Sequence, residues 1–445
     1  MPSYLTEPRR QTPIAHETDV LVVGGGPAGI AAALAAARSG ARTFLVEQFN
    51  SLGGVGGPGL HNHISQVNAH GSPLRVVGGL AWELGLRIRD AGVGDLGSCY
   101  DVDPEGYKFL LDEWLAEAGV RVLYHTFVAD AWVEAGVLRG VVVQNKSGRQ
   151  AIAAGQVIDC TGDGDVGCLA GAPWEQGRDG DGRCQPVTMM FRMGGVDWAQ
   201  VCAWRKDYQC IPFFEELQAR GEMEPFQNQI MGFWHNSVRP DQVGINFTHV
   251  IAIDSTKAEE LTAATIEGRR QVQHCVQVFR QHIPGFQDGY LIDTAATIGL
   301  RESRRLLGDY VLTFEDITAR REFADSIGYG SFFVDIHNLD GPGMSPSTLR
   351  PEPGFRYQMP YRILVPREVE NLLAAGRCVS VTHRALGSVR VMLTCMVLGE
   401  AAGVAAAQAL AAGVAPRAVD VGRLRTELRA RGVLLDEDDL ARANA

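Results

Sequence analysis

Residues 19–47 read DVLVVGGGPAGIAAALAAARSGARTFLVE, and this stretch decides the fold. Residues 20–23 are a continuous apolar run rich in β-branched side chains, which is typical of a parallel strand covered on both faces. After a glycine turn, the alanine-rich segment 28–38 contains few groups that compete with helix formation. Residues 43–46 form a second apolar run that ends at Glu47. This order predicts a strand, a turn, a helix and a second strand, followed by an acid.

The turn has the spacing G-x-G-x-x-G at Gly24, Gly26 and Gly29. Gly24 allows a tight turn, Gly26 leaves room for a pyrophosphate beside the backbone, and Gly29 lets the helix pack closely against the strand. The helix begins near Pro27, and the free amides of its first turn, from Ala28 onward, face the same place and favour an anion. Because motif, strand, helix and distal acid coincide, we interpret the turn as a dinucleotide site.

The residues after the second strand indicate which dinucleotide binds. Glu47 stands where a carboxylate can accept both hydroxyls of an adenosine ribose, and an acid there disfavours a 2′-phosphate. Gln48 then leads into a second glycine-dense loop, in which Gly53 and Gly54 let the backbone approach another part of a long ligand. An NAD(P)H domain would show a second G-x-G-x-x-G after a strand, and the sequence shows none. The sequence therefore shows one dinucleotide site and no separate NAD(P)H domain, and the rest of the chain decides between a nicotinamide and a flavin.

Length and composition limit the other classes of protein. The chain has 445 residues, which favours two interleaved domains over one core, and a formal net charge of -11. An acidic chain without a basic run argues against nucleic acid and anionic membranes as partners, although a local patch could still steer an anion. Residues 389–415 are apolar but interrupted by charged and polar side chains, so we expect no membrane span. The nine cysteines show no zinc spacing, so we expect reduced thiols, a cytoplasmic protein and no metal site.

Five further motifs extend the pattern through the rest of the chain. They are VIDCTGDGD at 157–165, IGLRESRRLLGDY at 298–310, PYRILVP at 360–366, AAGRC at 374–378 and the run from HRALGSVRVM at 383–392 to GEAAGVAAA at 399–407. With the first glycine turn, they resemble the glutathione-reductase-like FAD fold, and more narrowly the FAD-dependent oxidoreductase family, with relatives among the succinate/fumarate flavoproteins. The resemblance covers nearly the whole chain. It implies an α/β fold in which a Rossmann-like FAD-binding domain carries an inserted α+β substrate domain.

The resemblance also implies positions that contact FAD. Beyond the first turn and its Glu47 loop, it assigns them to Val128, Thr161, Gly162, Asp163, Gly376 and Arg377. Many members of the wider fold place an Asp where Arg377 stands, to hold a ribityl hydroxyl. We therefore expect that contact from Ser388, from Arg390, or from the amides of Val391 and Met392 at the start of the last long helix. A helix N-terminus there would stabilise an anionic reduced flavin.

The domain boundaries follow from these motifs. We expect a disordered leader at 1–18, the first part of the FAD-binding domain at 19–165, the inserted substrate domain and its return at 166–362, the second part of the FAD-binding domain at 363–415, and a C-terminal helix and tail at 416–445. Within the insertion, the alternating stretches 187–198 and 243–254 predict a sheet. Residues 204–229 and 258–282 predict helices.

Three clusters are candidates for catalysis or substrate binding. His61 and His63 follow the glycine loop that should run toward the flavin, where a neutral imidazole could remove a proton. A polar loop without catalytic duty is an equal alternative, and a metal pair would lack a third ligand. Arg301, followed by Glu302, could clamp a substrate carboxylate, or the two could form a structural pair between domains. His383, in the loop before the last helix, is an acid or base candidate beside the flavin. The weaker candidates are Asp335, His337 and Tyr361.

The sequence thus predicts an FAD-dependent oxidoreductase that transfers a hydride between a small organic substrate and flavin N5. Its second electron partner is oxygen, a quinone or a carrier protein, so dehydrogenase and oxidase both stay open. One alternative is a flavin electron-transfer subunit of a larger redox complex. Another is a dinucleotide- or metal-binding biosynthetic protein without redox turnover. The sequence also leaves open whether FAD is covalently attached and whether the chain forms a homo-oligomer.

Overall fold

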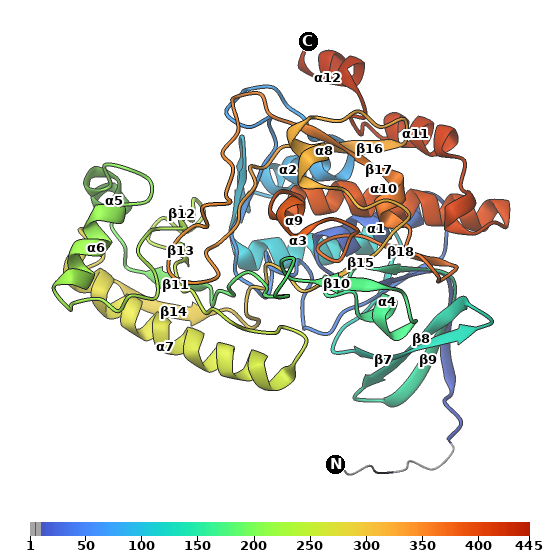
Figure 1. The fold of residues 1–445 in the computed structure, drawn as a ribbon, viewed down its shortest axis with the longest axis horizontal. Helices are drawn as coiled ribbons and strands as arrows, with labels where there is room; N and C mark the ends of the chain where they lie inside the picture. Colours follow the sequence, from blue (N-terminus) through green and yellow to red (C-terminus); the bar gives the residue numbers. More distant parts are fainter. Residues whose placement is uncertain (1–4, 6–9) are drawn as a thin grey trace.

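The computed structural model describes residue 5 and residues 10–445, and Figure 1 shows how they are arranged. A seven-stranded sheet has the order β6-β2-β1-β9-β8-β7, with β18 also paired to β9. The bounds are β1 (Ile14–Val23), β2 (Thr43–Val46), β6 (Arg121–Leu123), β7 (Phe127–Glu134), β8 (Val137–Asn145), β9 (Gly148–Asp159) and β18 (Leu372–Ala374). Strands β6, β2, β1, β9 and β18 are parallel, and β7 and β8 extend the sheet antiparallel. This confirms the predicted α/β fold with a Rossmann-like FAD-binding domain.

The first strand begins earlier than the sequence suggested. Residues 14–18 belong to β1, and they pair with β9 from Ala151 onward. The prediction of a disordered leader is therefore wrong for residues 14–18, because the long strand β9 offers backbone partners well beyond the motif. Residues 1–4 and 6–9 of that leader lie outside the described residues.

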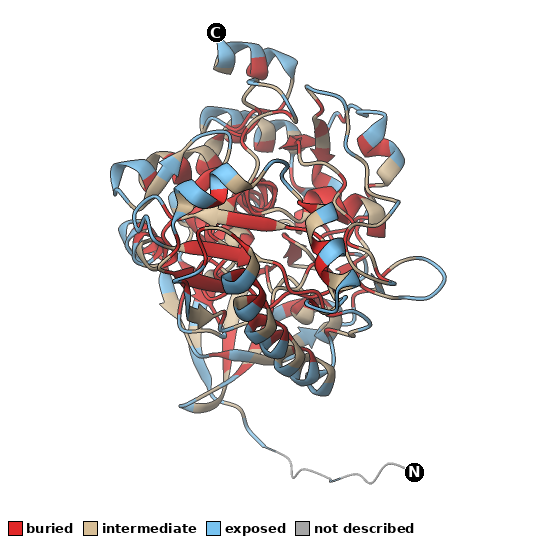
Figure 2. Ribbon diagram, turned by 90° about the vertical axis from the view of Figure 1, so that its left-hand side faces the viewer, coloured by how far each residue is buried: buried red, intermediate tan, exposed pale blue. Residues whose placement is uncertain are grey.

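Two helices pack at the centre of the FAD-binding domain. Helix α1 (Pro27–Arg38) starts at the glycine turn, and α10 (Met392–Ala412) crosses it at very short range. A Cβ at Gly399 would lie 2.0 Å from the carbonyl oxygen of Ala28, and one at Gly403 would lie 2.3 Å from that of Ala32. By length and composition α10 could span a membrane, but 83% of its most apolar window is buried inside the protein. Its apolar character is that of a core helix, and buried residues dominate the centre of Figure 2.

Further elements complete this domain. They are the small sheet β3 (His63–Ile64), β4 (Gly94–Leu96) and β5 (Tyr100–Val102), and the helices α2 (Gly79–Asp90), α3 (Pro104–Glu117), α4 (Asp165–Leu169) and α9 (His383–Val389). After α10 come η2 (Pro416–Ala418), α11 (Val421–Ala430) and α12 (Glu437–Asn444). The C-terminal segment therefore holds two α-helices where the sequence suggested one. Asp436 caps the second, because its side chain accepts the N–H of Asp439.

The inserted unit has a sheet and a hydrophobic core of its own. Its antiparallel sheet has the order β12 (Gly232–His235), β13 (Val243–Asn246), β11 (Phe191–Gly194) and β14 (Tyr290–Thr294). The helices are α5 (Trp198–Trp204), α6 (Ile211–Ala219) and α7 (Ala258–His282). Helix α7 has the predicted bounds, whereas the helix predicted at 204–229 is wrong. Pro212 starts a separate short helix, and Gly221, with a φ of +73°, follows its end.

The chain returns to the FAD-binding core earlier than expected. Strand β10 (Trp174–Gln176) pairs with β15 (Arg304–Leu306), and then α8 (Phe314–Thr318), β16 (Ser326–Gly330), β17 (Tyr357–Pro360) and η1 (Tyr361–Leu364) follow. Leu312, Ile327 and Tyr357 are buried in one cluster with α1 and α10. The separate cluster of the inserted unit draws on residues 187–298 and on Leu60. The predicted insertion at 166–362 is therefore too long at its end, since apolar side chains from residue 312 onward pack against the other core.

A buried carboxyl ties α10 to the start of α2. Glu400 is 2% exposed, and its Oε2 accepts the N–H of Leu80 at 2.8 Å. Gly79 makes room for it, because a Cβ there would lie 2.3 Å from Glu400 Oε2. Burial raises the pKa of Glu400 to about 7. The folded protein therefore holds a proton on this group at a pH where the unfolded chain has lost it.

Because the unfolded chain loses this proton first, the free energy of unfolding falls as pH rises from 4.5, the ordinary pKa of the group, to about 7, its pKa in the folded protein. We expect the Glu400→Gln variant to lack that loss and to gain roughly 3 kcal/mol relative to the parent between pH 4.5 and 8. Urea unfolding across this pH range measures it, and Glu113→Gln, an exposed position on α3, is the control. Parallel pH profiles for parent and Glu400→Gln would contradict the assignment.

Candidate functional site

Two cavities meet between the FAD-binding domain and the inserted unit. The smaller has a volume of about 210 Å³ and the larger about 510 Å³. Both are lined by Val55, Gly299, Leu300, Arg377, Arg390 and Met392. The shared walls join the cavities into one elongated site, which suits a long ligand with a second molecule at one end.

Most of the predicted FAD-binding residues line the smaller cavity. They are Gly24, Gly26, Pro27, Ala28, Glu47, Gln48, Gly54, Val128, Thr161, Gly162, Asp163, Gly376, Arg377, Arg390 and Met392. Val391 lines the larger cavity. Gly29 and Gly53 support the turn from behind, since a Cβ at Gly29 would lie 1.8 Å from Gly24 O, and the N–H of Gly53 donates to Gly25 O.

Ser388 is placed away from both cavities. Its hydroxyl is fully buried and lies 2.5 Å from Phe332 O and 2.7 Å from Tyr357 Oη. The prediction of a ribityl contact from Ser388 is therefore wrong, because these neighbours already use its hydrogen-bonding capacity. Arg390, Val391 and Met392 remain at the cavity walls.

The start of α1 fits a pyrophosphate. A Cβ placed at Gly26 would meet only Gly54 Cα, at 4.0 Å, so the space beside this residue is open. Gly26 is the N-cap residue of α1, so no N-cap side chain accepts a hydrogen bond from the first amides of the helix. Gly24 has a φ of +103°, and a Cβ there would lie 2.3 Å from Cys160 O. The turn thus presents uncapped amides and the positive end of a helix to an open cradle.

Glu47 is held in place at the far end of this cradle. Its Oε2 accepts the N–H of Gly25 at 2.6 Å, and its Oε1 accepts the N–H of Phe49 at 2.8 Å. Burial raises the pKa of Glu47, while these backbone donors act in the opposite direction. Each oxygen keeps a further lone pair for a ligand hydroxyl. The carboxylate therefore suits the ribose role that its spacing predicts.

Arg377 links two segments around the cradle. Its Nη1 donates to Asp163 Oδ1 at 3.0 Å, and Ser303 Oγ donates to the same oxygen at 2.6 Å. A Cβ at Gly162 would lie 2.6 Å from Arg377 Nη2, so the guanidinium rests on this glycine. These contacts fix the strand-end turn at 161–163 against the segment that follows β18.

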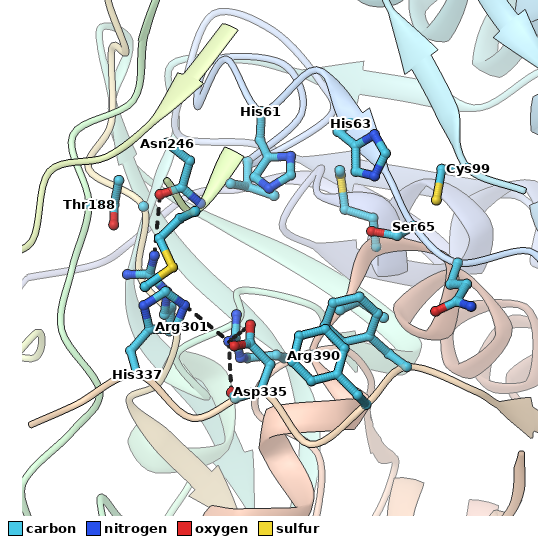
Figure 3. A pocket seen from close by; sticks show the side chains of 18 of the residues that line it. His61, His63, Ser65, Cys99, Thr188, Asn246, Arg301, Asp335, His337 and Arg390 are labelled. Atoms are coloured by element: carbon cyan, nitrogen blue, oxygen red, sulfur yellow. Dashed lines mark hydrogen bonds and ion pairs between the residues drawn. The ribbon is translucent and has the colours of Figure 1, made fainter. Parts of the chain in front are cut away.

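The larger cavity lies between the two units. His61, His63 and Arg301 line it, together with Thr188, Ile230, Trp234 and Asn246 from the inserted unit. Figure 3 shows His61 and His63 on one side of the pocket and Arg301, His337, Asp335 and Arg390 on the other. Sequence reasoning gave Asp335 and His337 little weight and missed Trp234 and Asn246. No local motif marks them, since they converge from separate strands and loops.

The two histidines beside the glycine loop differ in charge. Burial lowers the pKa of His61 to about 3, and the neighbouring His63 adds to this effect. Burial would also lower the pKa of His63, but hydrogen bonds with Asp101 and Cys99 outweigh it and raise the value to about 9. His63 Nδ1 lies 2.6 Å from Asp101 Oδ1 across the β3–β5 pair. At neutral pH His61 is therefore neutral and His63 is a cation, and both rings lie against Trp234.

His383 and Glu302 belong to a buried ion network instead of a cavity wall. His383 begins α9, and its Nδ1 lies 2.9 Å from both oxygens of Glu302. Arg305 Nη1 lies 2.5 Å from Glu302 Oε1. The prediction that His383 lies in a loop beside the flavin is therefore wrong. Neither His383 nor Glu302 lines a cavity, because the fully buried Glu302 carboxylate is held by His383 and Arg305. The weaker candidate Tyr361 donates its hydroxyl to Pro416 O and is equally remote.

Among the described residues, no group of three or more His, Cys, Asp or Glu side chains is arranged to hold a metal ion. The side-chain donors that line the two cavities are arginines, histidines, hydroxyls, amides and the Trp234 indole. This donor set suits phosphates, hydroxyls and organic anions.

Residues 19–428 match a family described as FAD dependent oxidoreductase. The chain is 38% identical over 131 residues to the tRNA uridine 5-carboxymethylaminomethyl modification enzyme MnmG of Thermus thermophilus, covering 28% of this chain and 22% of that enzyme. It is 32% identical over 157 residues to the thiamine thiazole synthase of Methanococcus vannielii, covering 33% of this chain and 56% of the synthase. The structure of a geranylgeranyl bacteriochlorophyll reductase-like protein from Thermoplasma acidophilum is similar at 16% identity and a TM-score of 0.47. The alignment covers 93% of this chain and 83% of the chain of that protein. The chain thus spans about a fifth of the first curated relative and just over half of the second.

The open cradle at Gly26 gives a test that separates binding from folding. We expect Gly26→Val to fold, because its φ of -73° suits any residue, and to purify with less than about a tenth of the parent's FAD, because the side chain fills the cradle. The ratio of flavin absorbance to protein absorbance measures this, with circular dichroism as the check on folding. Gly29→Ala should instead fail to fold, since its Cβ meets a backbone oxygen. Full flavin content in Gly26→Val would refute the placement.

Proposed function

The chain belongs to the FAD-dependent oxidoreductase family, and we propose that it oxidises a small organic substrate by hydride transfer to flavin N5 in the larger cavity. The junction of the two cavities carries this proposal. The α1 cradle would hold the pyrophosphate of FAD, and Arg390 and Met392 form a wall common to both cavities. A substrate in the larger cavity would therefore lie beside the flavin end of the cofactor.

His61 is the proposed proton acceptor. Its ring lines the larger cavity, and its buried Nδ1 has no hydrogen-bond partner among the described residues. His61 is neutral at neutral pH, so a ring nitrogen is free to accept a proton from a substrate O–H or N–H group, and an anion bound beside the arginines that lower its pKa would strengthen it as a base. The adjacent substrate C–H bond breaks with its electron pair. The bound FAD supplies the isoalloxazine ring that accepts this pair.

The start of α10 supports charge development at the same wall. Val391 is the N-cap of this 21-residue helix, and it lines the larger cavity. Arg390 Nη2 is held by Asp335 Oδ2 at 2.8 Å and by Asp335 O at 3.1 Å. The positive end of the helix and this guanidinium together stabilise negative charge in the cavity.

We propose oxygen, a quinone or a carrier protein as the second electron partner. The cytoplasmic location stays a prediction from the sequence, and the oligomeric state stays open. The substrates in the names of the two curated relatives do not carry over, because the matched segments cover a third of this chain or less.

The test is reduction of the FAD-loaded protein under nitrogen by a panel of small alcohols, amines, hydroxy acids and amino acids. We expect saturable bleaching of the oxidised flavin band by members of one class. Aerobic and quinone-supplemented turnover then separate oxidase from dehydrogenase. Dithionite reduction is the control for a competent flavin. A protein that dithionite reduces but no member of the panel bleaches would contradict the proposal and favour an electron-transfer subunit.

With a bleaching substrate in hand, His61→Gln tests the proton acceptor. We expect the anaerobic reduction rate to fall by about 10²- to 10⁴-fold while FAD content stays that of the parent, because the amide cannot accept the proton. His282→Gln, at the outer end of α7, is the matched control and should reduce at the parent rate. Stopped-flow absorbance measures both rates. An unchanged rate in His61→Gln would assign the proton to another group.

A further inference from the structure

The larger cavity is electropositive in an acidic protein. Among the described residues that line it are four arginines, at 301, 350, 377 and 390, and a single carboxylate, Asp335. The whole chain carries a formal net charge of -11. A concentration of one sign of charge in a low-dielectric recess attracts ligands of the other sign.

Most of these cations already have partners. Arg377 pairs with Asp163 at 3.0 Å, and Arg390 pairs with Asp335 at 2.8 Å. Arg350 is exposed to solvent, and its guanidinium carbon lies 5.6 Å from the centroid of the Phe333 ring. Arg377 and Arg390 are therefore paired and Arg350 is hydrated, so none of the three requires a further anion.

Arg301 differs from the other three. It is 7% exposed, and no carboxylate of the described residues lies within 4.0 Å of its nitrogens. Its Nη1 donates to Pro186 O at 2.6 Å, and its Nη2 donates to Asn246 Oδ1 at 3.5 Å. Both acceptors are neutral, and the only carboxylate that offsets the charge among the described residues is Asp335, which pairs directly with Arg390 and acts on Arg301 from farther away. Such a charge lowers stability unless a ligand of opposite sign joins it.

We propose that Arg301 recognises a carboxylate of the substrate, which makes the substrate a small organic acid. This inference rests on the proposed function, because it assigns the substrate class of the same cavity. The planar guanidinium offers a fork of donors that matches the two oxygens of a carboxylate. Asn246 turns its oxygen to Arg301, so its amide –NH₂ is available as a second donor.

The charge of Arg301 is suited to this task at neutral pH. Burial, with the like charge of Arg390, lowers the pKa of Arg301 to about 9. The guanidinium therefore stays protonated in the physiological range while its environment disfavours the charge. A bound carboxylate relieves that cost, and affinity gains accordingly.

The anion also connects to the proposed base. Besides burial and His63, the charges of Arg301 and Arg390 lower the pKa of His61. A carboxylate at Arg301 offsets part of this effect, so His61 becomes a stronger base when the acid is bound. Figure 3 places His61 across the pocket from Arg301, and both residues line the same cavity of about 510 Å³. Recognition and proton removal thus act on opposite ends of one molecule.

Equilibrium dialysis of the oxidised FAD-loaded protein tests the site without turnover. The probes are butyrate, benzoate and succinate, compared with butyramide, benzamide and succinamide at constant ionic strength. We expect at least one acid to bind about tenfold or more tightly than its amide. Arg301→Met should weaken that acid about a hundredfold and leave the amide unchanged. Arg220→Met removes the same charge from the exposed end of α6 and should match the parent.

Arg301→Lys keeps the charge without the fork, should lose about tenfold, and serves if the Met variant fails to fold. Equal binding of acids and amides, or acid affinity that no Arg301 variant changes, would overturn the inference. The proposed function has a separate outcome. Acid binding through Arg301 with no flavin bleaching would retain the anion site and reject hydride transfer. Bleaching by an uncharged substrate, unaffected in Arg301→Met, would retain hydride transfer and reject the anion site.

Discussion

The contact between the backbones of α1 and α10 is the constraint on which the rest of the structure depends. Gly399 and Gly403 leave no side chain between α10 and the carbonyl oxygens of Ala28 and Ala32. The N-terminus of α1 forms the cradle of the smaller cavity, and that of α10 forms the wall shared with the larger one. Because the helices touch directly, the two ends of the dinucleotide site hold a fixed separation. Any side chain at these glycines would move one site relative to the other.

Electrostatics divides the elongated site into two kinds of environment. Around the cradle, charged groups have close partners, since Arg377 pairs with Asp163 and Glu47 accepts two backbone N–H groups. In the larger cavity the matching is incomplete, since Arg301 has only neutral acceptors. Compensated charges rigidify a binding site, whereas an uncompensated one gives a ligand something to neutralise. The difference in charge pairing therefore indicates the charge of the ligand that the larger cavity binds.

Sequence reasoning succeeded where the signal was local. The turn at Gly24, strand β2 and helix α7 follow from spacing and periodicity, and the α/β fold and the FAD-dependent family are confirmed. It failed where partners come from far along the chain. His383 has a motif that suggests the flavin, but Glu302, 81 residues earlier, holds its ring elsewhere. The boundary near residue 312 was missed for the same reason, because core membership depends on packing rather than on composition.

The inserted unit has its own core, and the chain enters and leaves it through the neighbouring strands β10 and β15. The two chain connections to the FAD-binding domain therefore lie side by side, while the inserted unit supplies much of the opposite wall of the larger cavity. Such an arrangement is modular. Substitutions at Trp234 on β12 or at Asn246 on β13 would change the wall of the larger cavity without altering the residues that line the α1 cradle. A different inserted unit on the same FAD-binding domain would therefore accept a different substrate.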